Sequence, residues 1–139
     1  MSLMKVFDVS GSAVSAQSQR LNVVASNLAN ADTVAGPDGT AYKARQVVFQ
    51  TVLMGQGTNA DTSTGVRVST VTESDAPGRR VHDPKHPSAD AEGYVTYSNV
   101  SAVEEMVNMI SASRSYQNNV DVMNTARSLL LKTLQIGQG

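Results

Sequence analysis

The sequence predicts a mostly α-helical chain with a small β-containing middle, in which long N- and C-terminal helices pair as a coiled coil. The distribution of proline and glycine is the first observation behind this prediction. All four prolines and seven of the ten glycines of the 139-residue chain lie between residues 36 and 93. Because both residue types interrupt helices, long helices are allowed at the two ends and discouraged in the middle.

Apolar periodicity at the two ends is the second observation. The N-terminal seam consists of Met4, Phe7, Gly11, Val14, Ser18, Leu21, Ala25 and Leu28. The C-terminal seam consists of Val103, Met106, Met109, Ser113, Tyr116, Val120, Met123, Arg127, Leu130 and Leu134. Such spacing of three and four is typical of helices that pack together, within one chain or with copies of it. Leu21 and Met123 are one possible facing pair.

Three regions follow from these patterns. We expect an N-terminal coiled-coil helix in residues 1–33, a central β and loop region in 34–97, and a C-terminal coiled-coil helix in 98–139. Ser101 to Glu104 matches a capping box ahead of the last helix, and Gly137 is typical of its end.

Short strands are expected in the middle. The segments 46–53, 65–72 and 93–98 have the composition of strands, and the small polar segment 54–65 is predicted to be a mobile surface loop. In the second strand Val66 and Val68 alternate with polar residues, but Val71 breaks this alternation.

Neutral amides replace charges on the predicted helices. Between Val9 and Ala31 the only charged residue is Arg20. Amide side chains can be buried against another polar helix without the desolvation cost of a charge, so these faces suit burial by neighbouring subunits. An amide-rich two-helix domain of ordinary type is the alternative. The residues that we expect at an assembly interface are Phe7, Val14, Leu21, Asn22, Asn27, Leu28, Asn30, Met109, Tyr116, Asn119, Val120, Met123, Asn124, Leu130 and Leu134.

Composition argues against several classes of function. The net charge is −1 without any block of like charge, which disfavours nucleic acid and anionic membranes as partners. There is no cysteine, so thiolate chemistry is excluded. His82 and His86 lie four residues apart, but Pro84 and Pro87 disfavour the helix that would bring them together, so we expect an exposed loop without a metal. We expect no enzymatic activity, no cofactor and no small-molecule substrate.

Two long terminal motifs carry a resemblance to a known family. "SAQSQRLNVVASNLANADT" followed by "GPDGTAYKARQVVF" is similar to the N-terminal signature of the flagellar axial proteins, in the form typical of the proximal rod. "EEMVNMISASRSYQNNVDVMNTARSLLLKTLQIGQ" resembles the C-terminal helix of that family. The central segments "GVRVSTV" and "DPKHPSADAEGYV" are similar to its middle. One departure is the separation of Thr33 from Tyr42 by "VAGPDGTA", where many axial proteins place Gly-Tyr almost directly after the Asn-Thr pair.

The resemblance implies a structural subunit of the bacterial flagellar basal body. In this family the terminal helices form the inner tube around the export channel, and the rod crosses the periplasm and transmits torque. Expected partners are other copies, the rod proteins FlgB, FlgF and FlgG, the adaptor FliE at the MS ring, and the flagellar type III export apparatus. The N-terminus lacks the pattern of a cleaved secretory signal, and export by that apparatus would explain this. Asn27 and Asn30 lie in the family's "SNLANADT" box, which implies contacts between subunits. The rival interpretation is a soluble helical adaptor or export chaperone that stays in the cytoplasm.

Overall fold

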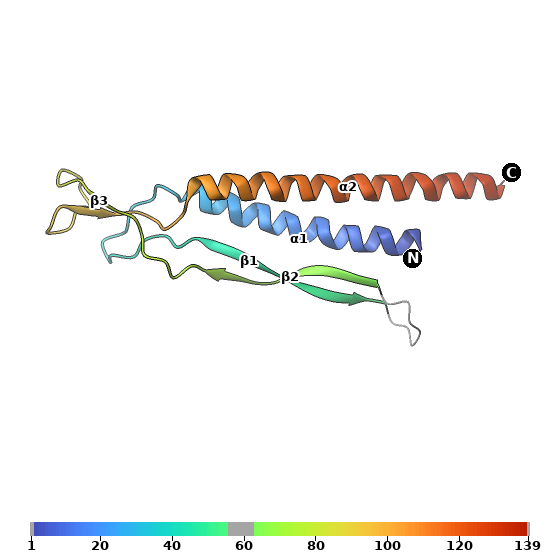
Figure 1. Cartoon of the computed structure of the whole chain (residues 1–139), viewed down its shortest axis with the longest axis horizontal. Coiled ribbons are helices and arrows are strands. Elements are labelled where there is room, and N and C mark those ends of the chain that lie inside the picture. Colours follow the sequence, from blue (N-terminus) through green and yellow to red (C-terminus); the bar gives the residue numbers. More distant parts are fainter. Residues whose placement is uncertain (1, 56–62, 139) are drawn as a thin grey trace.

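The computed structural model describes residues 2–55 and 63–138. Helix α1 (Leu3–Ala29) and helix α2 (Ala102–Gln138) run side by side in opposite directions, so the molecule is elongated (Figure 1). Strands β1 (Arg45–Met54) and β2 (Ser63–Glu73) form a hairpin along the side of α1 that faces away from α2 (Figure 1). The short strands β3 (Arg80–His82) and β4 (Tyr94–Thr96) lie at one end. The predicted fold class is confirmed.

Each of the two helices begins directly after a serine. Ser2 caps α1, because its hydroxyl oxygen accepts a hydrogen bond from the backbone N–H of Lys5 at 3.2 Å. Helix α2 begins directly after Ser101 and continues past Gly137, so the stop expected at that glycine is wrong. No atom lies within 4 Å of the place that a side chain at Gly137 would occupy. A glycine without tertiary contacts weakens a helix by about 1 kcal/mol but does not turn the chain.

The β1–β2 hairpin is antiparallel and confirms two predicted strands. Val48 pairs with Thr70 and Phe49 with Val68, which leaves Ser69 as the extra residue of a β-bulge. The bulge explains why Val71 breaks the alternation of its strand. The loop predicted over residues 54–65 is wrong at both of its ends, because Met54 is the last residue of β1 and residues 63–65 are the first of β2, and its residues 56–62 lie outside the described residues.

The second sheet joins distant parts of the chain. Strand β4 confirms the third predicted strand, whereas β3 lies in a proline-rich segment and was not predicted. Ser98 then ties the start of α2 to the end of α1, because its buried hydroxyl group donates a hydrogen bond to the Ala31 carbonyl at 2.6 Å.

The contact between α1 and α2 uses smaller residues than the seam predicts. Ala112 and Ala126 are buried in it, and the terminal methyl group of Met123 lies 3.9 Å from the position of a Cβ at Gly11. Leu21 is ten residues further along α1, about 15 Å at the rise of a helix, so the facing pair of Leu21 and Met123 is wrong. Five positions of the predicted C-terminal seam are exposed instead, namely Val103, Met106, Ser113, Arg127 and Leu134, and so are four of the N-terminal seam, namely Met4, Phe7, Ser18 and Ala25. The predicted seam of α2 is thus shifted from the face that the helix buries, since Ser113 and Arg127 directly follow the buried Ala112 and Ala126.

The hairpin also approaches α1 closely. A Cβ at Gly65 would lie 2.5 Å from the sulfur of Met54 and 2.7 Å from the hydroxyl oxygen of Ser12. That hydroxyl group accepts a hydrogen bond from the N–H of Val66 at 3.1 Å and donates to the Val9 carbonyl at 2.7 Å. Helix α1 is therefore packed on two sides, by α2 and by the hairpin.

Candidate assembly surface

The structure places the predicted interface residues at different depths. Asn27 is fully buried, whereas Phe7, Asn22, Asn124 and Leu134 are exposed. The other ten are half-buried within the single chain: Val14, Leu21, Leu28, Asn30, Met109, Tyr116, Asn119, Val120, Met123 and Leu130. Most of the predicted residues therefore present only part of their surface to a neighbouring molecule.

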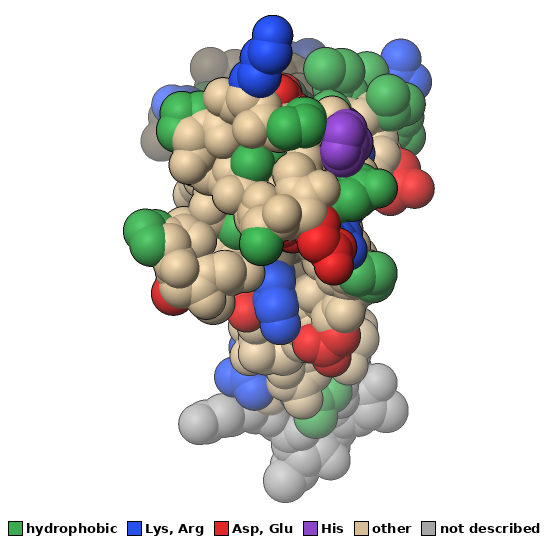
Figure 2. All heavy atoms as spheres, turned by 90° about the vertical axis from the view of Figure 1, so that its left-hand side faces the viewer, with side chains coloured by type: hydrophobic (Ala, Val, Ile, Leu, Met, Phe, Trp, Pro, Cys, Tyr) green, Lys and Arg blue, Asp and Glu red, His purple; other side chains and the backbone are tan. Residues whose placement is uncertain are grey.

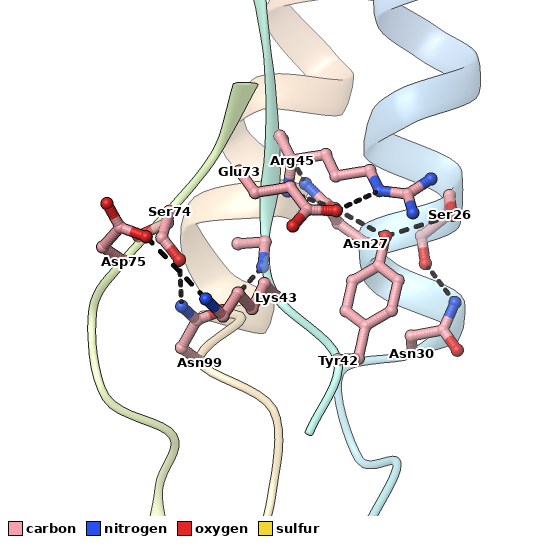
Figure 3. A network of polar contacts seen from close by, with 11 residues as sticks. Ser26, Asn27, Asn30, Tyr42, Lys43, Arg45, Glu73, Ser74, Asp75 and Asn99 are labelled. Atoms are coloured by element: carbon pink, nitrogen blue, oxygen red, sulfur yellow. Dashed lines mark hydrogen bonds and ion pairs between the residues drawn. The ribbon is translucent and has the colours of Figure 1, made fainter. Parts of the chain in front are cut away.

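Asn27 connects α1 to the first residue of β1 (Figure 3). Its amide nitrogen donates to the Arg45 carbonyl at 2.8 Å, and its amide oxygen accepts from the Arg45 N–H at 3.0 Å. The Tyr42 hydroxyl group donates to the same oxygen at 3.0 Å. The Asn27 side chain thus bonds to both the N–H and the C=O of Arg45, as a residue of a neighbouring strand would. The amide of Asn27 is used within the chain, which differs from the contact between subunits that the resemblance implies.

Asn99 plays a similar part at the start of α2 (Figure 3). Its amide oxygen accepts from the Ala44 N–H at 2.6 Å, and its amide nitrogen donates to the carbonyls of Ser74 and Ala76 at 3.1 and 2.8 Å. Residues 99–101 match a glycosylation sequon formally, but this amide nitrogen is already engaged. The sequence predicts Asn99 in the cap region of the last helix, but that position does not predict its hydrogen bonds to residues 44, 74 and 76.

The other amides bond mainly within or between the helices. Asn30 and Asn119 each donate to the carbonyl four residues earlier in their own helix, at 2.8 and 2.7 Å. Arg20 donates to the side-chain oxygen of Asn108 across the α1–α2 contact at 3.3 Å. The prediction that amides occupy only the outer faces is therefore wrong for Asn108, which takes part in the contact between the two helices.

An apolar strip on the first turns of α2 is exposed instead. We name Val103, Met106, Val107 and Ile110 the outer strip, and their exposed fractions are 73%, 56%, 61% and 56%. Glu105 and Ala112 occupy the opposite, buried side of this helix. The spacing of three and four places the four apolar residues on one face. The spacing predicts Val103 and Met106 on the inner seam, whereas the structure buries Glu105, which lies between them in the sequence.

The far end of α2 is a second exposed apolar region. The last residues of α2 that line a common pocket with the start of α1 are Ala126, Arg127 and Leu130. Residues 131–138 extend about 12 Å beyond this pocket and are all exposed (Figure 1). They include Leu131, Leu134 and Ile136. Leu131 and Leu134 are three residues apart and lie on one face of the helix, and exposed apolar side chains that share a face are typical of surfaces that another protein covers.

Comparison with known proteins assigns the chain to a family. The family model "Flagella basal body rod protein" matches residues 7–37, and "Flagellar basal body rod FlgEFG protein C-terminal" matches residues 91–136. Proteins named "Flagellar basal-body rod protein FlgC" from Salmonella typhimurium strain LT2, Escherichia coli O6:H1 and Yersinia enterocolitica are 57%, 58% and 59% identical to it. Each alignment covers 99% of this chain and 100% of the relative. The chain belongs to the FlgC family.

Membership of the FlgC family makes this chain a structural subunit of the flagellar basal-body rod. The two matched segments correspond to α1 with the turn that follows it, and to β4 with most of α2. The family signature therefore covers the two helices and leaves out the β1–β2 hairpin. Neither helix, within the described residues, has the length and hydropathy needed to cross a membrane.

The β3–β4 end of this FlgC-family chain carries charged side chains beside hydrophobic ones (Figure 2). Figure 2 looks onto that end and shows acidic and basic side chains interspersed. Arg80 pairs with Asp90 at 3.0 Å and lies over the ring of Tyr94 at 4.7 Å. Hydrogen bonds from the backbone N–H groups of Tyr94, which has the largest effect, and of Glu92 hold the pKa of Asp90 below its usual range, with a smaller contribution from Arg80. These contacts fix the turn between the two strands.

The two histidines lie at the same end. His82 is the last residue of β3 and not part of a loop, and its ring lies edge-on to Tyr94 at 5.0 Å. The Nδ1 atom of His86 accepts a hydrogen bond from the Ser88 N–H at 3.0 Å. Within residues 2–55 and 63–138, no three His, Asp or Glu side chains are grouped closely enough to hold a metal ion.

Proposed function

We propose that copies of this chain assemble through α1 and α2 around the central channel of the proximal rod. The observation that carries the proposal is the outer strip of α2, since four large apolar residues face solvent on a helix whose opposite side is already buried. Covering such side chains stabilises an assembly by about 25 cal/mol for each Å² of apolar surface removed from water. The exposed end of α2, residues 131–138, supplies a further apolar region for a neighbouring subunit.

The resemblance supports a specific set of neighbours and a location. We infer that the chain contacts FlgB, FlgF and FlgG along the rod, and FliE where the rod meets the MS ring. In this proposal the flagellar type III apparatus exports the chain without a cleaved signal, and the rod lies in the periplasm and transmits torque. The chain has a purely mechanical role and catalyses no reaction. Membership of the rod family gives no support to the soluble adaptor or export chaperone.

Electron cryotomography of cells that lack this gene tests the structural role. We expect membrane rings without rods, and rods again when the intact gene is returned. Normal rods in the deletion strain would contradict the proposal. Localisation separates the adaptor from the rod subunit, because an adaptor would be absent from purified basal bodies.

A paired substitution tests the outer strip itself. Val107→Asp with Ile110→Asp places two charges in the strip, and we expect rods to be lost because a buried unpaired charge is costly. Ser111→Asp is the matched control, since it adds a charge at an exposed position just outside the strip. Equal numbers of rods in the two strains would show that the strip is not an interface.

A further inference from the structure

The β1–β2 hairpin has two outer edges, because its sheet contains only two strands in the part of the chain that the structure describes. In an antiparallel pair, the backbone N–H and C=O of every second residue point away from the partner strand. The bond from the Ser74 N–H to the Ala44 carbonyl, at 2.8 Å, shows that Ala44 points inward. Alternation along the register then places the outward backbone groups on Arg45, Val47, Phe49, Thr51 and Leu53 of β1, and on Thr64, Val66, Val68, Val71 and Glu73 of β2.

Among the residues that the structure describes, helix α1 forms hydrogen bonds with each edge at one place only. At one end Asn27 bonds to both outward backbone groups of Arg45 on β1, and at the other end Ser12 bonds to the N–H of Val66 on β2. The two strands cross over each other along the helix because the hairpin is twisted (Figure 1). Within the described residues, the outward groups of the β1 segment 49–53 and the β2 segment 68–73 have no such partner.

The uncovered part of β1 lacks the devices that usually protect an edge strand. From Gln46 to Met54 there is no charged residue, no proline and no glycine. Soluble proteins normally place lysine, proline or an inward charge on a long exposed edge, because an unprotected one pairs with other strands. Phe49 and Leu53 are exposed here, the latter to 71%. This edge is therefore built to be covered by another extended chain.

We propose that the β1 edge at residues 49–53 pairs with the β2 edge at residues 68–73 of a second copy, so that one sheet continues from subunit to subunit. A row of unpaired backbone groups selects an extended backbone, and this chain exposes a second such row of its own. The two edges belong to different strands, so the contact is heterologous and builds an open assembly instead of a closed dimer. The inference rests on the self-assembly proposed above.

A proline substitution tests the edge without breaking the hairpin. The N–H of Thr51 points outward, so Thr51→Pro removes a donor that the pairing with β2 does not use, and proline is tolerated at such edge positions. Thr51→Val keeps the donor and is the matched control. We expect the proline variant to form about tenfold fewer rods than the valine variant. Equal numbers would overturn the proposal.

Disulfide crosslinking tests the partner. The chain has no cysteine, and Thr51 lies four positions along β1 from Val47, the partner of Val71. A pair made by Thr51→Cys and Val71→Cys is thus about 13 Å apart within one chain, too far for an internal disulfide. In oxidised basal bodies we expect a ladder of covalent multimers, with Val68→Cys or Glu73→Cys replacing the second change to scan the register.

The outcomes separate this inference from the proposed function. Multimers from any of the three pairs support the pairing of edges between copies. Basal bodies that contain the chain but give no multimer from all three pairs overturn it and leave the rod assignment intact. Absence of the unsubstituted chain from basal bodies would overturn both.

Discussion

Replacement of Asn27 by alanine removes the link between α1 and the first strand. The side chain is fully buried and takes part in three hydrogen bonds, two with the Arg45 backbone and one with Tyr42. At about 1 kcal/mol for each bond, the loss is about 3 kcal/mol. Arg45 lies in an exposed strand, where water can replace part of the lost bonding, which lowers the expected loss of unfolding free energy to about 2 kcal/mol.

The assay is urea unfolding of the purified chain, monitored by far-ultraviolet circular dichroism. Asn22→Ala is the control, because Asn22 is exposed on the same helix, and we expect it to change the unfolding free energy by less than about 0.5 kcal/mol. A loss for Asn27→Ala as small as that of the control would refute the assignment of Asn27 as an internal link.

The same hydrogen bonds predict that the loss of stability in the Asn27→Asp variant depends on pH. An ionised carboxylate can accept from the Arg45 N–H but cannot donate to the Arg45 carbonyl, which the amide nitrogen reaches at 2.8 Å. The repulsion between these oxygens raises the pKa of the introduced carboxyl group in the folded state. The variant's deficit relative to the unsubstituted chain should therefore be present at neutral pH and shrink as the carboxyl group is protonated in acid. A deficit independent of pH would contradict the geometry.

Three further predictions concern other parts of the chain. Gly65→Ala should lower the unfolding free energy by about 1–3 kcal/mol in the same assay, because of the close approach of the hairpin to α1, whereas Gly137→Ala should be neutral or slightly stabilising. Ionised Asp90 stabilises the β3–β4 turn because its pKa is lowered in the folded state. This stabilisation is present above about pH 4 and is lost as the pH falls through the folded pKa. The amide resonance of Tyr94 should shift with this titration in an NMR experiment, and Asp90→Asn should abolish the shift. Trypsin should cut the isolated chain first after Lys132, beyond the α1–α2 contact, and equal resistance of the termini and the middle would contradict this.

The sequence predicted the elements of this fold well because each depends on local signals. Proline and glycine exclude long helices from the middle, and the strand-like composition of residues 46–53 and 65–72 locates both long strands to within two residues. Strand β3 escaped prediction because three residues carry too little pattern, and its pairing with β4 is a tertiary contact. The bulge at Ser69 was visible in advance only as a break in alternation at Val71.

The surface was predicted less well, for a physical reason. Periodicity shows which residues share a helix face, but it does not show which face the partner helix takes. In α2 the partner takes the face of Ala112 and Ala126, and the large apolar residues beside them are left outside. Asn27 was recognised as unusual, but its partner Arg45 lies 18 residues away in sequence, so only the folded chain could reveal that the bond is internal.

The unequal lengths of the two helices give the molecule a direction. At one end lie the strands β3 and β4, and at the other a single unpaired stretch of α2 reaches about 12 Å past α1 (Figure 1). Copies stacked along the helix axis with a common orientation would therefore form a filament whose two ends differ in the side chains that they expose. An incoming subunit would meet apolar side chains at one tip and paired charges at the other, so that addition at the two tips would proceed at different rates.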